Sequence, residues 1–426
     1  MDELIYKLRS DIKNLTTQSE QIAQQVTNLN DFVGLSDVLG IGWNPTSDTY
    51  RRLGQAINKT FGVNGAVNDF AVIAPYSQRR VCNLADDGVT VNAYFGDGNY
   101  VENGTNGQVM TEHVPFWYKA YVEDNEIITL ISPTVKTDTG WSLHPWFIDD
   151  VTGLPVKRYF STYEGCLWDS SASAYILNDA QVADFTVGTG DKLSSITGAK
   201  PISGHTQNLT RSNARKLANN RGTRWQQQHN NAVAAIQMMM LIEIGDYKSQ
   251  ERVGQGVVSL TDDGSTNMAI ATGDTSALGN GSGWVLNNGQ RSVRYGGIEN
   301  FWGNIWKWVD GVNVTDSSIF VSRKNSGFVD DIFTGDYQYI GEPIASASGY
   351  VSNLVVNTTN NYTSFPKQTT GSSSTKIGDY LYRSTGVRGA LLGGDWYGGA
   401  FAGARCWALG SSSGNRSRDI GSRIVA

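Results

Sequence analysis

Residues 230–244 form a helix-length segment whose side chains are apolar around nearly the whole circumference. A helix at a protein surface would show a polar face, so this segment is predicted to be a helix buried on all sides in the centre of a core. It is too short to cross a membrane, and it also contains Gln237 and Glu243. The apolar residues that define it are Val233, Ile236, Met239, Met240 and Ile244.

The segments around this helix favour an α+β fold. A preceding helix is expected after Thr210, whose hydroxyl can cap its first turn, and Gly222 can follow its end. Another helix is expected over residues 47–61. Two helices in mid-chain followed by short, irregular strands indicate an α+β domain rather than a βαβ repeat. Short strands are expected at residues 89–95, 116–122, 126–131, 146–148 and 158–163.

The first 34 residues carry a seven-residue apolar repeat. Nine of its ten seam positions are apolar, and Ser19 is the exception. The repeat predicts a left-handed coiled coil between copies of the chain, and the alternative is one amphipathic helix docked on its own domain. β-branched residues at the first seam position favour a dimer, but Ser19 and Ile22 weaken that preference. The seam consists of Met1, Ile5, Leu8, Ile12, Leu15, Ser19, Ile22, Val26, Leu29 and Val33.

The composition argues against several classes of protein. The 34 basic and 40 acidic residues leave a net charge of −6, so nothing supplies the basic excess that nucleic-acid binding requires. Aromatic residues make up 11% of the 426 residues, which provides enough apolar area to order most of the chain. Three widely separated cysteines do not form a disulfide framework. No signal-peptide pattern is visible, so we expect synthesis in the cytoplasm and no membrane insertion.

Two tryptophan-rich stretches have a distinctive form. Residues 299–311 read ENFWGNIWKWVDG. Residues 389–426 contain a G-G-x-W segment, then an Ala-Arg pair and a final G-x-R. The rings of Trp302, Trp306 and Trp308 bury much apolar area, so we expect them to pack as core rather than to stack on a ligand.

These stretches resemble the formylglycine-generating-enzyme branch of the C-type lectin fold. More closely, the chain is similar to phage tail receptor-binding proteins of the major tropism determinant type, which carry that fold at their C-terminus. The segment QVMTEHVPFWYK at residues 108–119 resembles the entry strand of that domain. With the resemblance, the chain divides into a coiled-coil oligomerisation segment (1–34), a small α+β linker module (35–106) and a C-type-lectin-like receptor-binding domain (107–426).

The resemblance implies a function in host attachment. The chain would lie in the virion tail of a phage or prophage and bind a bacterial surface glycan or protein. It would form a homo-oligomer, for which the resemblance implies a trimer, and join tail or baseplate proteins through its N-terminus. Some of these relatives are diversified by retroelements in their last few dozen residues. No cofactor is expected, and calcium is left open because lectin-type folds often hold it.

The binding residues are expected between the framework positions of residues 395–422. There, rigid rings alternate with small polar and basic side chains, which is typical of adaptable recognition surfaces. The alternative is an ordinary Gly/Ser loop with incidental aromatic residues. The candidate receptor-binding residues are Asp395, Tyr397, Phe401, Trp407, Ser411, Ser412, Ser413, Asn415, Arg416 and Arg418.

We do not expect an enzyme. The formylglycine enzymes work through a pair of cysteines in the C-terminal region, whereas here that region holds only Cys406, and Cys166 lies far upstream. A single thiol beside Trp407 is more often a small packing residue than a nucleophile. Two alternatives stay open: an enzyme of the formylglycine type, which would need Cys406, and a structural baseplate protein that makes no receptor contact.

Overall fold

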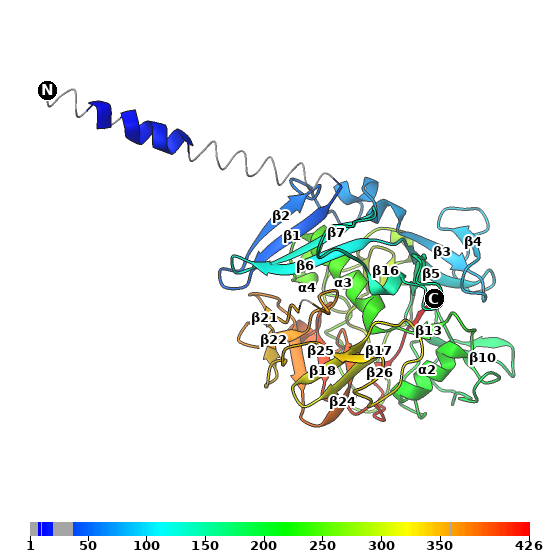
Figure 1. Cartoon of the computed structure of the whole chain (residues 1–426). Helices are drawn as coiled ribbons and strands as arrows, with labels where there is room; N and C mark the ends of the chain where they lie inside the picture. Colours follow the sequence, from blue (N-terminus) through cyan, green and yellow to red (C-terminus); the bar gives the residue numbers. More distant parts are fainter. Residues whose placement is uncertain (1–6, 10, 20–36, 358) are drawn as a thin grey trace.

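The computed structural model describes residues 7–9, 11–19, 37–357 and 359–426. These residues form a mixed α+β fold made mostly of short strands, which confirms the expected fold class. Figure 1 shows α3 (Asn230–Ile244) at the centre, with a sheet of early strands above it and a sheet of late strands below it.

The upper sheet is antiparallel and joins strands from the start of the described body with strands more than 60 residues later. Trp43 of its second strand lies opposite Tyr50 on one side and Ile127 on the other. Its strands, in spatial order, are β2 (Thr49–Gly54), β1 (Leu39–Asn44), β7 (Glu126–Ser132), β6 (Trp117–Glu123) and β8 (Ser142–Leu143).

The lower sheet has eight strands and is built from the last third of the chain. Its longest strand is β17 (Trp306–Thr315), which pairs with β24 (Val387–Leu392) through an irregular register. Strand β26 (Ile420–Gly421) pairs with the beginning of β17. Its strands are β19 (Tyr337–Tyr339), β18 (Ser318–Ser322), β17 (Trp306–Thr315), β24 (Val387–Leu392), β25 (Trp407–Leu409), β23 (Tyr380–Arg383), β20 (Gly349–Tyr350) and β26 (Ile420–Gly421).

A third sheet joins the last strand of the chain to strands from much earlier in the sequence, because that last strand pairs with residues 158–161 and 226–227. Its strands are β13 (Gln226–Gln227), β27 (Ile424–Val425), β9 (Arg158–Ser161), β5 (Gln108–His113), β3 (Arg80–Leu84) and β4 (Val91–Tyr94). Smaller sheets contain β10 (Cys166–Asp169), β11 (Ala174–Ile176), β12 (Lys192–Ser194), β14 (Gly283–Trp284), β15 (Val293–Tyr295), β16 (Ile298–Glu299), β21 (Asn353–Leu354) and β22 (Pro366–Gln368).

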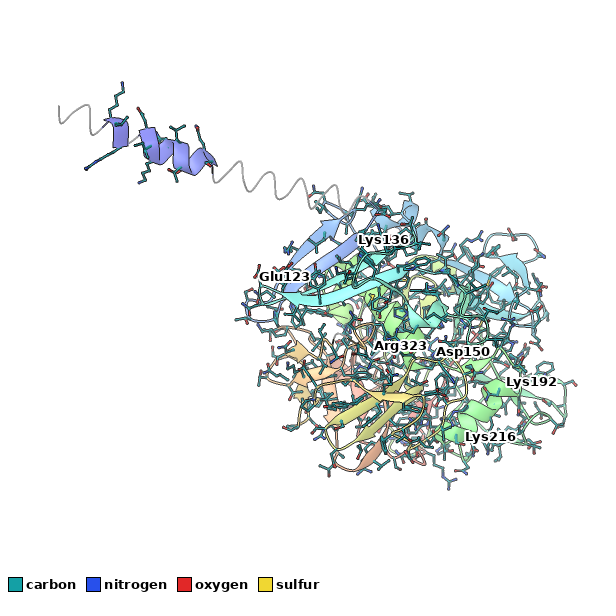
Figure 2. The ribbon with its side chains drawn as sticks, in the orientation of Figure 1. Glu123, Lys136, Asp150, Lys192, Lys216 and Arg323 are labelled. Carbon is teal, nitrogen blue, oxygen red and sulfur yellow. The ribbon has the colours of Figure 1, made fainter. Side chains whose placement is uncertain are left out.

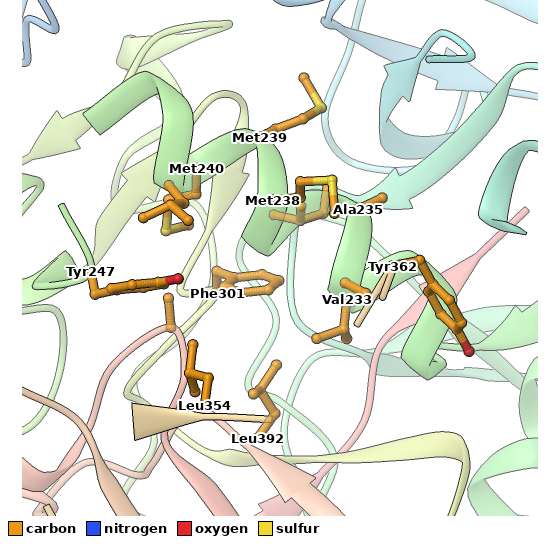
Figure 3. Close-up of a cluster of buried hydrophobic side chains, with 14 of the residues drawn as sticks. Val233, Ala235, Met238, Met239, Met240, Tyr247, Phe301, Leu354, Tyr362 and Leu392 are labelled. Atoms are coloured by element: carbon orange, nitrogen blue, oxygen red, sulfur yellow. The ribbon is translucent and has the colours of Figure 1, made fainter. Parts of the chain in front are cut away.

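The central helix is buried along its entire length, as predicted. The two polar side chains in its second half are paired, since Glu243 accepts hydrogen bonds from Arg79 and Tyr295, and Gln237 donates to the carbonyl of Ala404. Gly245, in the left-handed conformation, ends the helix. Figure 3 shows Val233, Met238 and Met240 in one cluster with Phe301, Leu354 and Leu392.

The other helices are short. α2 (Arg211–Asn219) begins where expected, with the Thr210 hydroxyl accepting a hydrogen bond from the N–H of Asn213. Helix α4 (Ser249–Arg252) follows α3 closely. The 3₁₀ turns are η1 (Asp69–Val72), η2 (Tyr76–Gln78), η3 (Pro145–Phe147), η4 (Ser276–Leu278) and η5 (Gly399–Phe401).

The helix predicted over residues 47–61 is wrong. The chain forms a β1–β2 hairpin there, because the Asn44 side chain accepts hydrogen bonds from two backbone N–H groups of the turn and Asp48 adopts a positive φ of 57°. This turn chemistry and the pairing with β1 override the helical pattern. The strand predicted at 146–148 is also wrong, since Pro145 starts a 3₁₀ turn there and His144 caps it.

The boundary expected at residue 106 does not coincide with a break between sheets. β1 and β2 share a sheet with β6 and β7, and β3 and β4 share one with β5 and β9. Residues on the two sides of that boundary therefore build the same layers.

Most of the expected coiled-coil segment lies outside the described residues. Within it, residues 7–9 and 11–19 are helical and exposed. The seam residues Leu8, Ile12 and Leu15 are 60%, 55% and 64% exposed. The helix is therefore observed where it is described, and the coiled coil itself stays a prediction.

Several charged side chains lie at the periphery of the body, whereas others are buried. Figure 2 places Glu123 and Lys136 at the edge of the upper sheet, and Lys192 and Lys216 at the opposite end of the molecule. Within the described ranges, none of the helices combines the length and apolar character needed to span a membrane.

Candidate functional site

A cavity of about 420 Å³ opens beside the lower sheet, on the face that points away from α3. Five strands of that sheet and the loops after β24 and β25 contribute to it. The side chains that line it include Trp306, Tyr382, Leu391, Asp395, Tyr397, Phe401, Cys406, Ala408, Ser411, Asn415, Ser417, Asp419 and Ile420. We call this cavity the C-terminal pocket.

Strand parity decides which side chains reach the pocket. In the parallel pair β23–β25, Leu381 lies opposite Trp407, and Tyr382 lies opposite Ala408. Successive side chains of a strand point to opposite faces of the sheet. Leu381 and Trp407 pack in the core around α3, where the ring of Trp407 lies 5.1 Å from that of Phe365. Tyr382 and Ala408 consequently line the pocket.

Aromatic rings form one wall of the C-terminal pocket. The rings of Trp306 and Tyr382 lie 5.8 Å apart, and those of Tyr382 and Phe401 lie 6.1 Å apart. Tyr397 and Phe401 are the most exposed of these side chains, at 48% and 40%. Phe401 also lies 4.7 Å from the ring of Tyr380, so the row of rings continues beyond the pocket.

Two carboxylates, Asp395 and Asp419, belong to the same pocket. Asp395 is 4% exposed and accepts hydrogen bonds from the indole N–H of Trp306 at 2.9 Å and from the backbone N–H of Tyr397 at 3.2 Å. Burial and the charge of Asp419 raise the pKa of Asp395 to about 7, which outweighs the lowering effect of the two hydrogen bonds.

A double-glycine turn shapes the rim of the pocket. Gly393 and Gly394 have φ values of 98° and 86°. A Cβ on Gly394 would lie 2.6 Å from the Cβ of Ala402, so only glycine fits there. The turn leaves Trp396 fully buried and Tyr397 outside. The two glycines thus supply the positive φ values and the close backbone approach that this turn requires.

The structure brings half of the ten candidate residues together. Those that line the pocket are Asp395, Tyr397, Phe401, Ser411 and Asn415. Trp407 differs from the expectation, because it is 1% exposed and faces the core. On the paired strands β23 and β25 it lies opposite Leu381, and both side chains point to the core face of the sheet. Its ring is not available to a receptor.

The remaining candidates lie in the loop after β25 and are tied to neighbouring segments. Ser413 is buried and donates to Asp331 at 2.6 Å. Arg418 makes two hydrogen bonds of 2.6 Å to the carboxylate of Asp262. Arg416 is exposed and donates to Asn208, and Ser412 is exposed. These contacts fix the loop but direct the two arginines away from the pocket lining.

Several pocket residues were not among the candidates. Trp306 was expected to be core; it is 8% exposed and still contributes to the pocket. Tyr382 lies upstream of the region that the motifs define, although the alternation Tyr-Leu-Tyr at residues 380–382 is a signal for a strand with one aromatic face. The other missed residues of the pocket are Leu391, Cys406, Ala408, Ser417, Asp419 and Ile420.

All three cysteines of the chain are buried and free. Cys406 is buried at the pocket, and burial, together with the charge of Asp379, raises the pKa of its thiol well above the usual range. Cys82 and Cys166 are also buried and free. Among the residues that the structure describes, no group of three or more His, Cys, Asp or Glu side chains could hold a metal ion.

The chain matches no protein-family model and no curated protein sequence. It has a distant similarity to solved structures of the Major Tropism Determinant. The M1 variant is 14% identical with a TM-score of 0.25, the I1 variant 15% identical with a TM-score of 0.23, and the P3c variant 13% identical with a TM-score of 0.24. Each match covers 82% of this chain and 71% of the other. Values this low do not place the chain in a family.

Proposed function

We propose that this chain is a tail receptor-binding protein of a phage or prophage, and that the C-terminal pocket contacts the bacterial surface. The observation that carries the proposal is the convergence of exposed rings and polar side chains on one cavity. Tyr397 and Phe401 are large apolar groups held at the surface by a rigid turn, and such groups are a liability unless they bind a partner. The phage-tail assignment rests on the sequence motifs, which resemble receptor-binding proteins.

The surroundings of the pocket suit a binding site. Its walls come from paired strands, and the loop after β25 is held by the bonds of Ser413 and Arg418. A scaffold that is rigid before binding loses little conformational entropy when a ligand arrives. Retroelement diversification of the outward residues stays a prediction from the resemblance, and so does the lectin-like character of the domain.

We also propose that the N-terminal helix joins several copies of the chain and attaches them to the tail. Leu8, Ile12 and Leu15 follow the spacing of a coiled-coil seam and are more than half exposed. Several pockets on one oligomer would add weak contacts into a strong attachment.

A binding role is favoured over an enzyme of the formylglycine type by the state of Cys406. A reactive cysteine needs a lowered thiol pKa, whereas burial raises the pKa of this thiol. An enzyme of the formylglycine type would lose its activity on Cys406→Ala, whereas a receptor-binding protein has no such activity to lose.

The experiment is a binding assay of the full-length protein on cells of candidate bacterial hosts. The variant Tyr397→Ala/Phe401→Ala should lose at least tenfold in bound protein, because both rings line the pocket. Tyr339→Ala is the matched control, since Tyr339 is 38% exposed and does not line the pocket. Unchanged binding by the double variant would contradict the proposal and favour a structural baseplate protein.

A further inference from the structure

The C-terminal pocket has an unbalanced charge. Among its described lining residues, Asp395 and Asp419 are acidic, and no lysine, arginine or histidine is present. Arg405, Arg416 and Arg418 are sequence neighbours of lining residues, and each is bound elsewhere. Arg418 makes two hydrogen bonds to Asp262, Arg416 donates to Asn208, and Arg405 donates to Ser364. An anionic ligand such as a phosphate or a carboxylated sugar would therefore meet repulsion, and a cation would meet attraction.

The carboxylates have unused capacity to accept hydrogen bonds. The Oδ1 oxygen of Asp419 is buried and receives no hydrogen bond from the described residues. Each oxygen of Asp395 receives one, from Trp306 and from the N–H of Tyr397. An ionised carboxylate has about four acceptor sites, so both groups can bind further N–H or O–H donors.

The raised pKa of Asp395 is a consequence of this imbalance, because a buried carboxylate beside a second acidic group binds a proton more readily. Burial and Asp419 raise its pKa to about 7, and Asp262 contributes in the same direction. Lys307 is the neighbouring cation, but its ammonium is buried and bound to Glu164 at 2.9 Å. The other titratable groups that interact with Asp395 are Tyr382, Tyr397 and Cys406.

The aromatic wall adds a second attraction for a cation. The faces of Trp and Tyr rings attract ammonium groups within about 6 Å, and the attraction is stronger in a partly desolvated site. The rings of Trp306, Tyr382, Tyr397 and Phe401 border the same space as the two carboxylates. Aromatic faces beside carboxylates are a suitable environment for an ammonium group on a partly apolar frame.

We propose that the C-terminal pocket binds an amino sugar that carries a free ammonium group. The ammonium would lie between Asp395 and Asp419, and the apolar face of the sugar ring would stack on the aromatic wall. The hydroxyls would use Ser411, Asn415 and Ser417, which also line the pocket. A lysine side chain carries no hydroxyl groups for these three polar side chains, whereas a sugar ring does, so the lining favours a sugar over a peptide. This inference rests on the proposed function and specifies its ligand.

The test compares ligands that differ in one group. Saturation-transfer NMR of the full-length protein at pH 7 would use methyl glucosaminide, its N-acetyl derivative and methyl glucoside, with Nα-acetyl-lysine amide as the peptide probe. We expect methyl glucosaminide to bind at least tenfold more tightly than the other three. Equal binding of the three sugars, a preference for the lysine amide, or no binding of methyl glucosaminide would each overturn the inference.

Variants locate the site and separate this inference from the proposed function. Asp395→Asn and Asp419→Asn should each weaken methyl glucosaminide binding at least tenfold, whereas Asp336→Asn, an exposed carboxylate outside the pocket, should not. Thermal melting would verify that each variant is folded. If only one of the two pocket variants folds, that variant is enough to test the inference. If both pocket variants fold and keep full affinity, the inference fails. Host-cell binding that is lost in Tyr397→Ala/Phe401→Ala but unchanged in both Asn variants would retain the receptor-binding function and reject the amino sugar.

Discussion

Several ionisable side chains of this protein are buried, and burial changes the pKa of some of them. Asp379, which precedes β23, is 2% exposed and accepts a hydrogen bond of 2.6 Å from the backbone N–H of Arg405. Burial raises the pKa of its carboxyl from 3.8 to about 8, although the hydrogen bond and the charge of Arg405 act in the opposite direction. The native chain therefore keeps this proton over a pH range in which the unfolded chain has lost it.

This difference makes stability depend on pH. Because the native state binds the extra proton, the contribution of Asp379 is full below pH 4 and is lost as the pH rises towards 8. Asp379→Asn keeps the acceptor and cannot ionise. Urea unfolding should show equal stability of variant and parent near pH 4, and a variant more stable by on the order of a few kcal/mol at pH 9. Asp336→Asn is the exposed control, and a pH-independent difference for Asp379→Asn would contradict the prediction.

At the scale of elements, strand parity separates folding residues from binding residues in the same stretch of sequence. Trp407 and Tyr397 are ten positions apart, and both were candidate receptor contacts. The side chain of Trp407 on β25 points to the face of the sheet that packs against α3. Tyr397 follows the double-glycine turn, and its side chain stays half exposed. The same type of side chain thus has two different tasks.

The two residues should respond differently to truncation. Trp407→Ala removes a fully buried ring and should lower the free energy of unfolding by about 3–5 kcal/mol. Tyr397→Ala should change it by less than about 1 kcal/mol, because the ring is largely solvated in the native state. Urea denaturation of both variants would measure this, and equal losses would show that the parity argument does not hold.

For the molecule as a whole, attachment depends on how many pockets act together. The body presents one C-terminal pocket per chain, and the exposed seam of the N-terminal helix offers a way to combine chains. Both parts are needed for avidity, since single contacts with surface sugars are weak.

The seam can be tested in the full chain. Leu8→Asp/Leu15→Asp places charges at two seam positions and should convert the oligomer to single chains in sedimentation velocity. Lys13→Asp/Thr17→Asp changes two other exposed positions of the same helix and should leave the oligomer intact. A parent protein that is already a single chain would refute the coiled coil.

The local patterns were sufficient where one short-range cause dominates. The apolar segment 230–244 and the Thr210 cap each have the structure that their sequence predicts. At residues 47–61 a strand replaced the expected helix, because pairing with β1 outweighed local propensity.

The sequence by itself determined that a helix must be buried at the centre of an α+β body, and that the last 40 residues combine fixed turns with rings and small polar groups. Only the tertiary structure decided which of those rings faces outward. A strand sends alternate side chains to opposite faces, and the packing of the sheet against α3 selects the face that becomes core. That choice buries Trp407 and turns Tyr382, which lies outside the two tryptophan-rich stretches, to the pocket. It also leaves Trp306 and Asp419 at the pocket, although neither was a candidate binding residue.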